Sequence, residues 1–185
     1  MVNYTVSNIQ ANHSIVAEFG QLELIISAHN NAVGKVTARY KIGSGSWQTI
    51  SSVSTSGTSI TVPVNSAVTI EANANTGYRW AANANVFVVE LPESGTDENV
   101  PTTSATTSFQ DVVDHMVEDM EYIIQAPTSV PQYTITPSAG SGGTITPNTP
   151  QTVYQGDSVT FQVTPNTGYR IKSVKLDGSP MQPDS

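Results

Sequence analysis

Two stretches of the sequence, 91 residues apart, read almost alike and decide the fold. The first is Val68-Thr-Ile-Glu-Ala-Asn-Ala-Asn-Thr-Gly-Tyr-Arg79 and the second is Val159-Thr-Phe-Gln-Val-Thr-Pro-Asn-Thr-Gly-Tyr-Arg170. Each begins with alternating apolar and polar residues, which is typical of a strand with one buried face. Each ends in Asn-Thr-Gly-Tyr-Arg, where glycine supplies the backbone conformation of a tight turn. The two stretches therefore predict two copies of one β-rich unit.

The similarity extends upstream, where Ile26–Thr37 resembles Ile135–Thr146. The first copy carries an insertion in the region Ala38–Ser59. Within it, glycines in Gly43-Ser-Gly45 predict a hairpin turn between two short strands. Further strands of the first copy are expected at Ser59–Val64, Ala67–Ala72 and Val86–Leu91.

The second copy predicts strands as well. Thr134–Pro137 and Gly143–Pro147 flank Ser138-Ala-Gly-Ser-Gly142, a composition that favours a hairpin between them. Further strands are expected at Ser158–Thr164 and Tyr169–Leu176.

One segment of the first copy departs from the strand pattern. Ser108-Phe-Gln-Asp111 has the spacing of a helix capping box. The apolar residues that follow recur at helical spacing, so we expect a helix over residues 109–120 and a strand at Glu121–Ala126. Pro92–Thr107 is polar and without periodicity, which predicts a loop.

The ends of the chain look like two parts of one unit. The second copy stops near Asp177-Gly178 without closing strands, while the chain opens with two alternating segments that belong to no preceding unit. We therefore expect a complete unit at residues 21–127 and a second unit made of residues 128–185 plus 1–20. The opening residues expected to complete the second unit are Tyr4, Val6, Ile9, Ile15, Ala17 and Phe19. The residues expected to receive them are Tyr133, Ile135, Val159, Phe161, Val163, Val174 and Leu176.

These sequences resemble a known family. Tyr133–Pro147, Asn166–Arg170, Val174–Gly178 and Tyr4–Phe19 are similar to the divergent internalin B-type repeat of bacterial surface proteins. The resemblance is close for these residues and loose for residues 21–127. It implies an extracellular, cell-surface protein with tandem copies that serve as stalks or adhesive modules, and it implies no catalytic residues. The expected fold is all-β, with two antiparallel β-sandwich or β-grasp-like units, the first carrying the one helix.

Three arrangements satisfy the split unit. The two ends meet in one molecule, as in a circular permutation. Alternatively, the opening segment completes the unit of another molecule by strand addition, which repeats head to tail and grows a fibre. In the third arrangement the chain is one period of a longer tandem protein, and neighbouring repeats of the same chain complete each other.

Composition excludes several classes of protein. The chain has 185 residues, 7 Lys+Arg, 15 Asp+Glu and no Cys, so it has neither disulfides nor a thiolate metal site. A net charge of −8 argues against a nucleic-acid partner, and no apolar run is long enough for membrane insertion. Nine of the acidic residues lie between Glu90 and Glu121, where no Lys or Arg interrupts them.

Candidate chemistry is sparse. His115 with Asp111 and Asp119 is spaced for metal binding on a helix, but a solvated helix face explains the pattern better, so no metal and no other cofactor is expected. No motif for a catalytic nucleophile or a phosphate loop is present. Four aromatic residues are candidate contacts for a glycan or for another subunit: Trp47, Tyr78, Trp80 and Tyr169.

The sequence thus favours a non-enzymatic building block of an extracellular bacterial surface fibre or stalk, assembled head to tail with itself by strand complementation. The alternative is a carbohydrate-binding module of a secreted multidomain protein.

Overall fold

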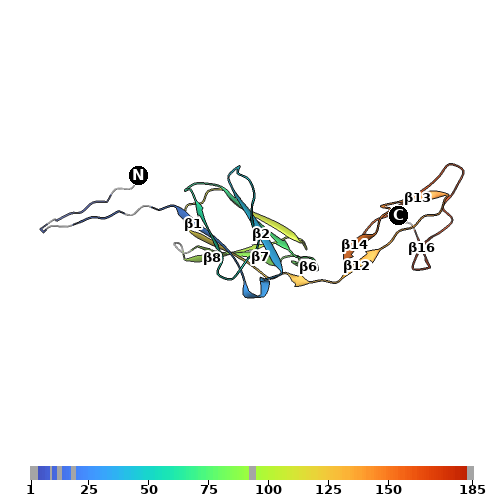
Figure 1. Ribbon diagram of the computed structural model, residues 1–185, viewed down its shortest axis with the longest axis horizontal. Coiled ribbons are helices and arrows are strands. Elements are labelled where there is room, and N and C mark those ends of the chain that lie inside the picture. The colour runs from blue at the N-terminus through green and yellow to red at the C-terminus, as the bar shows by residue number, and fades with distance from the viewer. Residues whose placement is uncertain (1–3, 9, 12–13, 18–19, 92–94, 183–185) are drawn as a thin grey trace.

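The computed structural model describes residues 4–8, 10–11, 14–17, 20–91 and 95–182 of the chain. An N-terminal segment, a two-sheet body (residues 22–124) and a smaller C-terminal unit (residues 132–181) follow one another along the long axis (Figure 1). Among the described residues, the only helical piece is one 3-10 turn, η1 (Asn30–Ala32). The prediction of an all-β chain is confirmed.

The larger sheet of the body has five strands and is completed by the last strand of the body. In order across the sheet they are β4 (Thr58–Val62), β1 (Leu22–Ala28), β10 (Met120–Ile124), β7 (Asn85–Leu91) and β8 (Thr96–Pro101). β10 runs parallel to β1 and antiparallel to β7. Without β10 this sheet would separate into two pairs, β4 with β1 and β7 with β8.

The second sheet of the body has four antiparallel strands. In order they are β3 (Gln48–Ile50), β2 (Val36–Ile42), β5 (Val68–Ala74) and β9 (Ser108–Val113). β2 and β3 form the hairpin predicted in the inserted region, and Gly43 has the positive φ of 54° that its turn requires. β9 lies at the edge, beside β5.

The apolar faces of the two sheets enclose one core. Phe87 lies near its centre, with its ring 5.3 Å from Tyr122 and 6.0 Å from Phe109, centroid to centroid. Trp80 is 1% exposed, and its indole N–H donates a 2.9 Å hydrogen bond to the carbonyl of Gln125, so its polar atom is satisfied. Each fully buried aliphatic side chain contributes about 1.5–3 kcal/mol, and the largest here include Leu24, Ile26, Ile70, Met116 and Ile124.

The helix expected over residues 109–120 is wrong. Its first half is strand β9, in which Phe109, Asp111 and Val113 are partly buried and alternate with exposed residues. The two adjacent valines suit a strand better than a helix, and pairing with β5 satisfies the backbone. The second half is a connection that buries Met116 in the core, with backbone hydrogen bonds to Asn65 and Ser66.

The loop expected at residues 92–107 is also partly wrong, because β8 lies within it and pairs antiparallel with β7. β8 is polar and mostly exposed, with acidic side chains at Asp97 and Glu98. It is an edge strand, for which polar and charged residues are typical. Because β8 is mostly exposed, its sequence lacks the alternation of apolar and polar residues by which a half-buried strand is predicted.

The C-terminal unit consists of three separate antiparallel pairs. They are β12 (Gln132–Ile135) with β14 (Gln151–Tyr154), β13 (Gly143–Thr146) with β15 (Gln162–Pro165), and β16 (Val174–Leu176) with β17 (Ser179–Met181). The expected hairpin between the first two strands is wrong, because β12 and β13 pair with β14 and β15 rather than with each other. No described residue from 128 to 182 is buried.

Candidate functional site

The three strand pairs of the C-terminal unit correspond to pairs of the body. By sequence, β12, β13, β14 and β15 align with β1, β2, β4 and β5, and the same strands pair in the same antiparallel sense. The shared turn is also alike: Gly77 and Gly168 both have φ of 85°. The backbone N–H after each glycine donates to an asparagine carbonyl, at 3.0 Å from Tyr78 and 2.9 Å from Tyr169. β16 and β17 form a further antiparallel pair, as β7 and β8 do in the body.

Three strands of the two body sheets, β3, β9 and β10, have no counterpart among the described residues of the C-terminal unit, and β3 belongs to the hairpin inserted in the first copy only. β10 joins β1 to β7 in the body, whereas the pairs β12–β14 and β16–β17 are separate sheets with no described strand paired to both. β9 covers the edge of β5, but within the described ranges β15 pairs with β13 alone. The described C-terminal unit, called the open unit below, therefore has strand edges that pair with no other described strand.

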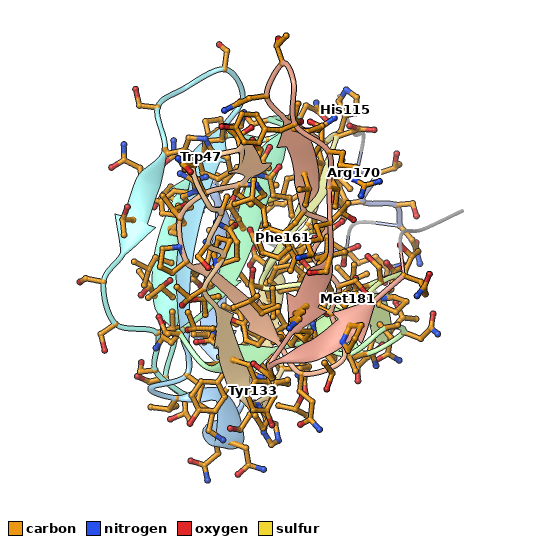
Figure 2. All side chains as sticks on the ribbon, turned by 90° about the vertical axis from the view of Figure 1, so that its right-hand side faces the viewer. Trp47, His115, Tyr133, Phe161, Arg170 and Met181 are labelled. Carbon is orange, nitrogen blue, oxygen red and sulfur yellow. The ribbon has the colours of Figure 1, made fainter. Side chains whose placement is uncertain are left out.

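Equivalent apolar residues have different burial in the two units. Val68, Ile70 and Ala72 in β5 are at most 1% exposed. Their counterparts 91 residues later, Val159, Phe161 and Val163, are only partly buried. Ile135 and Val174 are also partly buried, whereas Tyr133 is 56% and Leu176 50% exposed. The seven residues predicted to receive a strand thus lie in this unit with their apolar surface incompletely covered. Figure 2 views the unit end-on, with Tyr133 and Phe161 labelled.

The N-terminal segment has the opposite property: it exposes apolar side chains that nothing described covers. Tyr4 is 81%, Val6 53%, Ile15 72% and Val16 78% exposed. Ala17 is also exposed, and Ile9 and Phe19 lie outside the described residues. The segment extends from the β1 end of the body, whereas the open unit lies beyond the other end (Figure 1). The structure does not bring the two together within one chain.

Residues 133–185 match the family model described as "Divergent InlB B-repeat domain". The resemblance predicted from the sequence is confirmed for these residues. The InlB-type match spans the open unit, from β12 through β17. Repeats of this type are found in bacterial surface proteins and are typically non-catalytic. No curated protein and no solved structure matches the chain.

The InlB-type unit is joined to the body through a short β-ladder and an ion pair that the sequence did not reveal. β6 (Tyr78–Arg79) pairs with β11 (Thr128–Ser129). The Arg79 guanidinium donates to Asp157 Oδ1 at 2.7 Å and to the Gln155 carbonyl at 3.2 Å, and lies 5.1 Å from the centre of the Tyr154 ring. The shared Asn-Thr-Gly-Tyr-Arg motif marked Arg79 as part of a turn, but not as a contact between units.

The four candidate aromatic residues do not converge on one site. Trp80 is buried in the core and unavailable to a ligand. The Tyr78 carbonyl accepts from the Tyr154 hydroxyl at 3.5 Å, at the junction between units. Tyr169 is 62% exposed on the InlB-type unit, against Gly142, where no Cβ would fit. Only Trp47 lies on an outward sheet face of the body, partly exposed, with basic side chains beside it.

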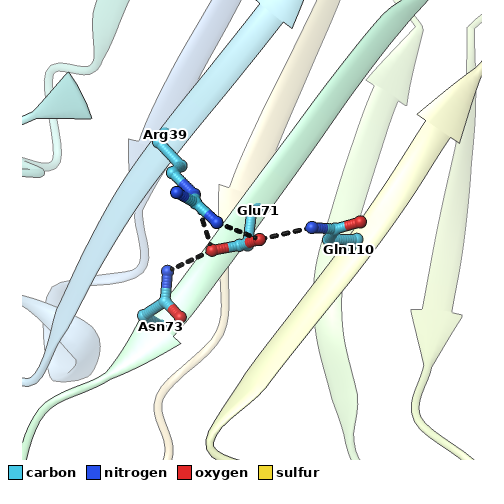
Figure 3. A network of polar contacts seen from close by, with 4 residues as sticks. All are labelled: Arg39, Glu71, Asn73 and Gln110. Atoms are coloured by element: carbon cyan, nitrogen blue, oxygen red, sulfur yellow. Dashed lines mark hydrogen bonds and ion pairs between the residues drawn. The ribbon is translucent and has the colours of Figure 1, made fainter. Parts of the chain in front are cut away.

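The outward face of the second sheet holds a polar cluster centred on Glu71 (Figure 3). The Glu71 carboxylate accepts from Arg39 Nε at 2.7 Å and Nη2 at 3.0 Å, from Asn73 Nδ2 at 2.9 Å and from Gln110. The hydrogen bonds from Arg39, with smaller contributions from Asn73 and Gln110, lower the pKa of Glu71 to about 2 despite the opposing effect of burial. These side chains come from β2, β5 and β9, so their proximity depends on strand order.

The suggested metal ligands point elsewhere. Asp111 Oδ2 accepts a 2.7 Å hydrogen bond from the Tyr122 hydroxyl, and Asp119 Oδ1 accepts from the Glu23 backbone N–H at 2.8 Å. No group of three His, Asp or Glu among the described residues is placed to hold a metal ion. Within the same ranges, the structure has no helix with the length and apolar character of a membrane span.

Proposed function

We propose that this chain is a structural, non-enzymatic building block of an extracellular bacterial surface fibre or stalk. In this proposal, residues 4–19 of one copy complete the InlB-type unit of its neighbour. The neighbour is a separate molecule or the adjoining period of a longer chain. The family match supports the surface-protein setting, and the complementary features of the two ends support the mode of assembly.

The observation that carries the proposal is that no described strand of the open unit takes the place of β10. In the body, β10 hydrogen-bonds to β1 on one side and β7 on the other. A donor strand from residues 14–19 would occupy the same position in the open unit, parallel to β12 and antiparallel to β16. Main-chain hydrogen bonds would form on both of its edges, and alternate side chains would enter the core.

The first part of the segment suits a second strand edge of the open unit. Residues 4–6 would pair with the free edge of β15, as β9 pairs with β5 in the body. The chain must then turn toward the other sheet, and Asn8, with φ of 54°, has a left-handed conformation typical of a turn. Tyr4 and Val6 would thereby cover Phe161 and its neighbours.

The proposed contact is head to tail. Donor and acceptor lie at opposite ends of the elongated chain (Figure 1), so each added copy presents a new open unit. Because the two surfaces differ, the contact is heterologous and extends into a filament unless a rotation closes a ring.

Deletion of residues 1–19 tests the proposal. We expect the full chain to form concentration-dependent oligomers in sedimentation velocity and the deletion variant to remain monomeric. A synthetic peptide of residues 3–20 should bind the deletion variant and protect amides of β12 and β16 from hydrogen exchange. Unchanged oligomers after the deletion would contradict the proposal. A full chain that stays monomeric while residues 14–17 are protected would indicate closure within one molecule.

One observation favours a second candidate function, that of a carbohydrate-binding module. Trp47 is partly exposed on a sheet face whose other outward side chains are mostly polar. Binding on a glycan array that is lost in Trp47→Ala would support it.

A further inference from the structure

The outward face of the second sheet concentrates positive charge on an acidic protein. The chain has 7 basic and 15 acidic residues. Three of the basic ones, Lys35, Arg39 and Lys41, lie at alternate positions along β2 or directly before it. Because Val36 and Ala38 between them are buried, Arg39 and Lys41 point to the solvent side of the sheet.

The neighbouring strands place one acidic residue on this face. Across the sheet, Arg39 lies between Thr49 of β3 and Glu71 of β5, and Glu71 lies beside Gln110 of β9. Arg39 already neutralises that carboxylate. In the adjacent rows the cross-strand partners are uncharged: Thr69 and Val112 beside Lys41, and Asn73 and Ser108 beside Thr37.

Trp47 is held at this charged face. Its ring centre lies 4.4 Å from the Arg39 guanidinium carbon and 5.1 Å from Lys41 Nζ. These cation–π contacts keep both basic groups beside the indole. Trp47 comes from the hairpin inserted in the first copy only, so the InlB-type unit has no equivalent.

We infer that the face around Trp47 binds a carbohydrate that carries carboxylate groups, such as a polyuronate. The indole provides an apolar surface for a sugar ring, and Lys41, which has no acidic partner in the described part of the chain, pairs with a sugar carboxylate. Exposed Thr37, Thr49 and Gln110 offer hydrogen bonds to sugar hydroxyls. A nucleic acid fits less well, because it requires a longer basic stripe than three side chains on a chain of charge −8.

This inference deepens the second candidate function and is independent of strand complementation, because all of its residues lie in the body. The probe is an oligogalacturonate, titrated into the full chain in low salt and followed by calorimetry. The matched ligand is its methyl ester, which has the same sugar without the charge. We expect the free acid to bind at least about tenfold more tightly than the ester, which corresponds to about 1.4 kcal/mol.

Three variants locate the site. Lys41→Gln should weaken binding of the free acid about tenfold and leave binding of the ester unchanged, and Trp47→Ala should abolish both. Lys172→Gln, on the InlB-type unit, is the matched control and should bind like the unaltered chain. Thermal melts of each variant check that the body remains folded, and Trp47→Phe should restore part of the binding if the ring itself is the contact.

Four outcomes would overturn the inference. They are absence of binding to the free acid, equal loss in Lys41→Gln and Lys172→Gln, equally tight binding of duplex DNA, and equal affinity for acid and ester. If acid and ester bind with equal affinity and both are lost in Trp47→Ala, the carbohydrate-binding function is retained and only the acidic ligand is rejected.

Discussion

Replacement of Ile15 by aspartate tests strand complementation most directly. Ile15 is 72% exposed in the chain. Full burial of an isoleucine contributes about 1.5–3 kcal/mol, so burial of this exposed surface in the acceptor should contribute about 1–2 kcal/mol. An unpaired polar group in apolar surroundings costs about a further 1–3 kcal/mol. The smallest sum, about 2 kcal/mol, predicts a rise of about 30-fold in the dissociation constant between copies.

The adjacent residue is the matched control. Val16 is 78% exposed, but in a strand it points to the face opposite that of Ile15. Val16→Asp introduces the same charge and removes a similar apolar group on the solvent side of the completed sheet. We expect its dissociation constant to change by no more than a few fold.

Sedimentation velocity of the full chain and the two variants over a wide range of concentration measures these constants. Both substitutions lie outside the body, so its melting temperature should not change. Equal weakening in the two variants would show that the segment does not bind as a strand with one buried face. Equal assembly of Ile15→Asp and the unaltered chain would refute the insertion of residues 14–19 into the open unit.

Three further predictions concern the body and its junction. Glu71 has a pKa lowered to about 2, so its contribution to stability should be complete above about pH 4.5 and lost as the pH falls toward 2. Thermal melts over this pH range should show the loss, and in Glu71→Gln this pH dependence should be absent. Tyr122→Phe leaves the Asp111 carboxylate without its 2.7 Å donor and should lower the free energy of unfolding by about 1.5–3 kcal/mol, measured by urea unfolding, with an unchanged midpoint arguing against this bond. Arg79→Ala removes the 2.7 Å ion pair with Asp157 and should change the free energy of unfolding by less than about 1 kcal/mol. It should nevertheless widen the distribution of distances between spin labels on the body and on the InlB-type unit. An unchanged distribution would assign the alignment of the two to the β6–β11 ladder alone.

The sequence predicted those parts of the fold that depend on local signals. The repeated motif indicated the second unit, whose residues 133–185 match the family model, and Gly43 with its flanking strands predicted the β2–β3 hairpin. The prediction of a helix over residues 109–120 was wrong because the spacing of the valines and methionines is compatible with a helix as well as with a strand. The structure of this segment depends on the pairing of β9 with β5, which is distant from it in the chain, and on the burial of Met116.

The candidate site was predictable only in part. The two copies predict that residues 4–19 supply closing strands to the second unit, and this stays a prediction. The central position of β10, on which the proposed donor strand is based, could not be read from the sequence, because it follows from the order β1, β10, β7 across the sheet. For the same reason the cluster of Arg39, Glu71 and Gln110 was missed, since cross-strand neighbours have no fixed spacing in the sequence.

The parallel pairing of β1 with β10 determines how the body bears a mechanical load. The chain enters the body at the start of β1 and leaves it after the end of β10, and the two strands are in register from Leu24 with Met120 to Ala28 with Ile124. Tension along the chain therefore pulls the two strands past each other in shear and stretches their hydrogen bonds together, rather than opening them one at a time as in a hairpin pulled from its ends. In the proposed fibre, β12 and a donor strand have the same geometry, so the joint between copies would resist force in the same way as the units themselves.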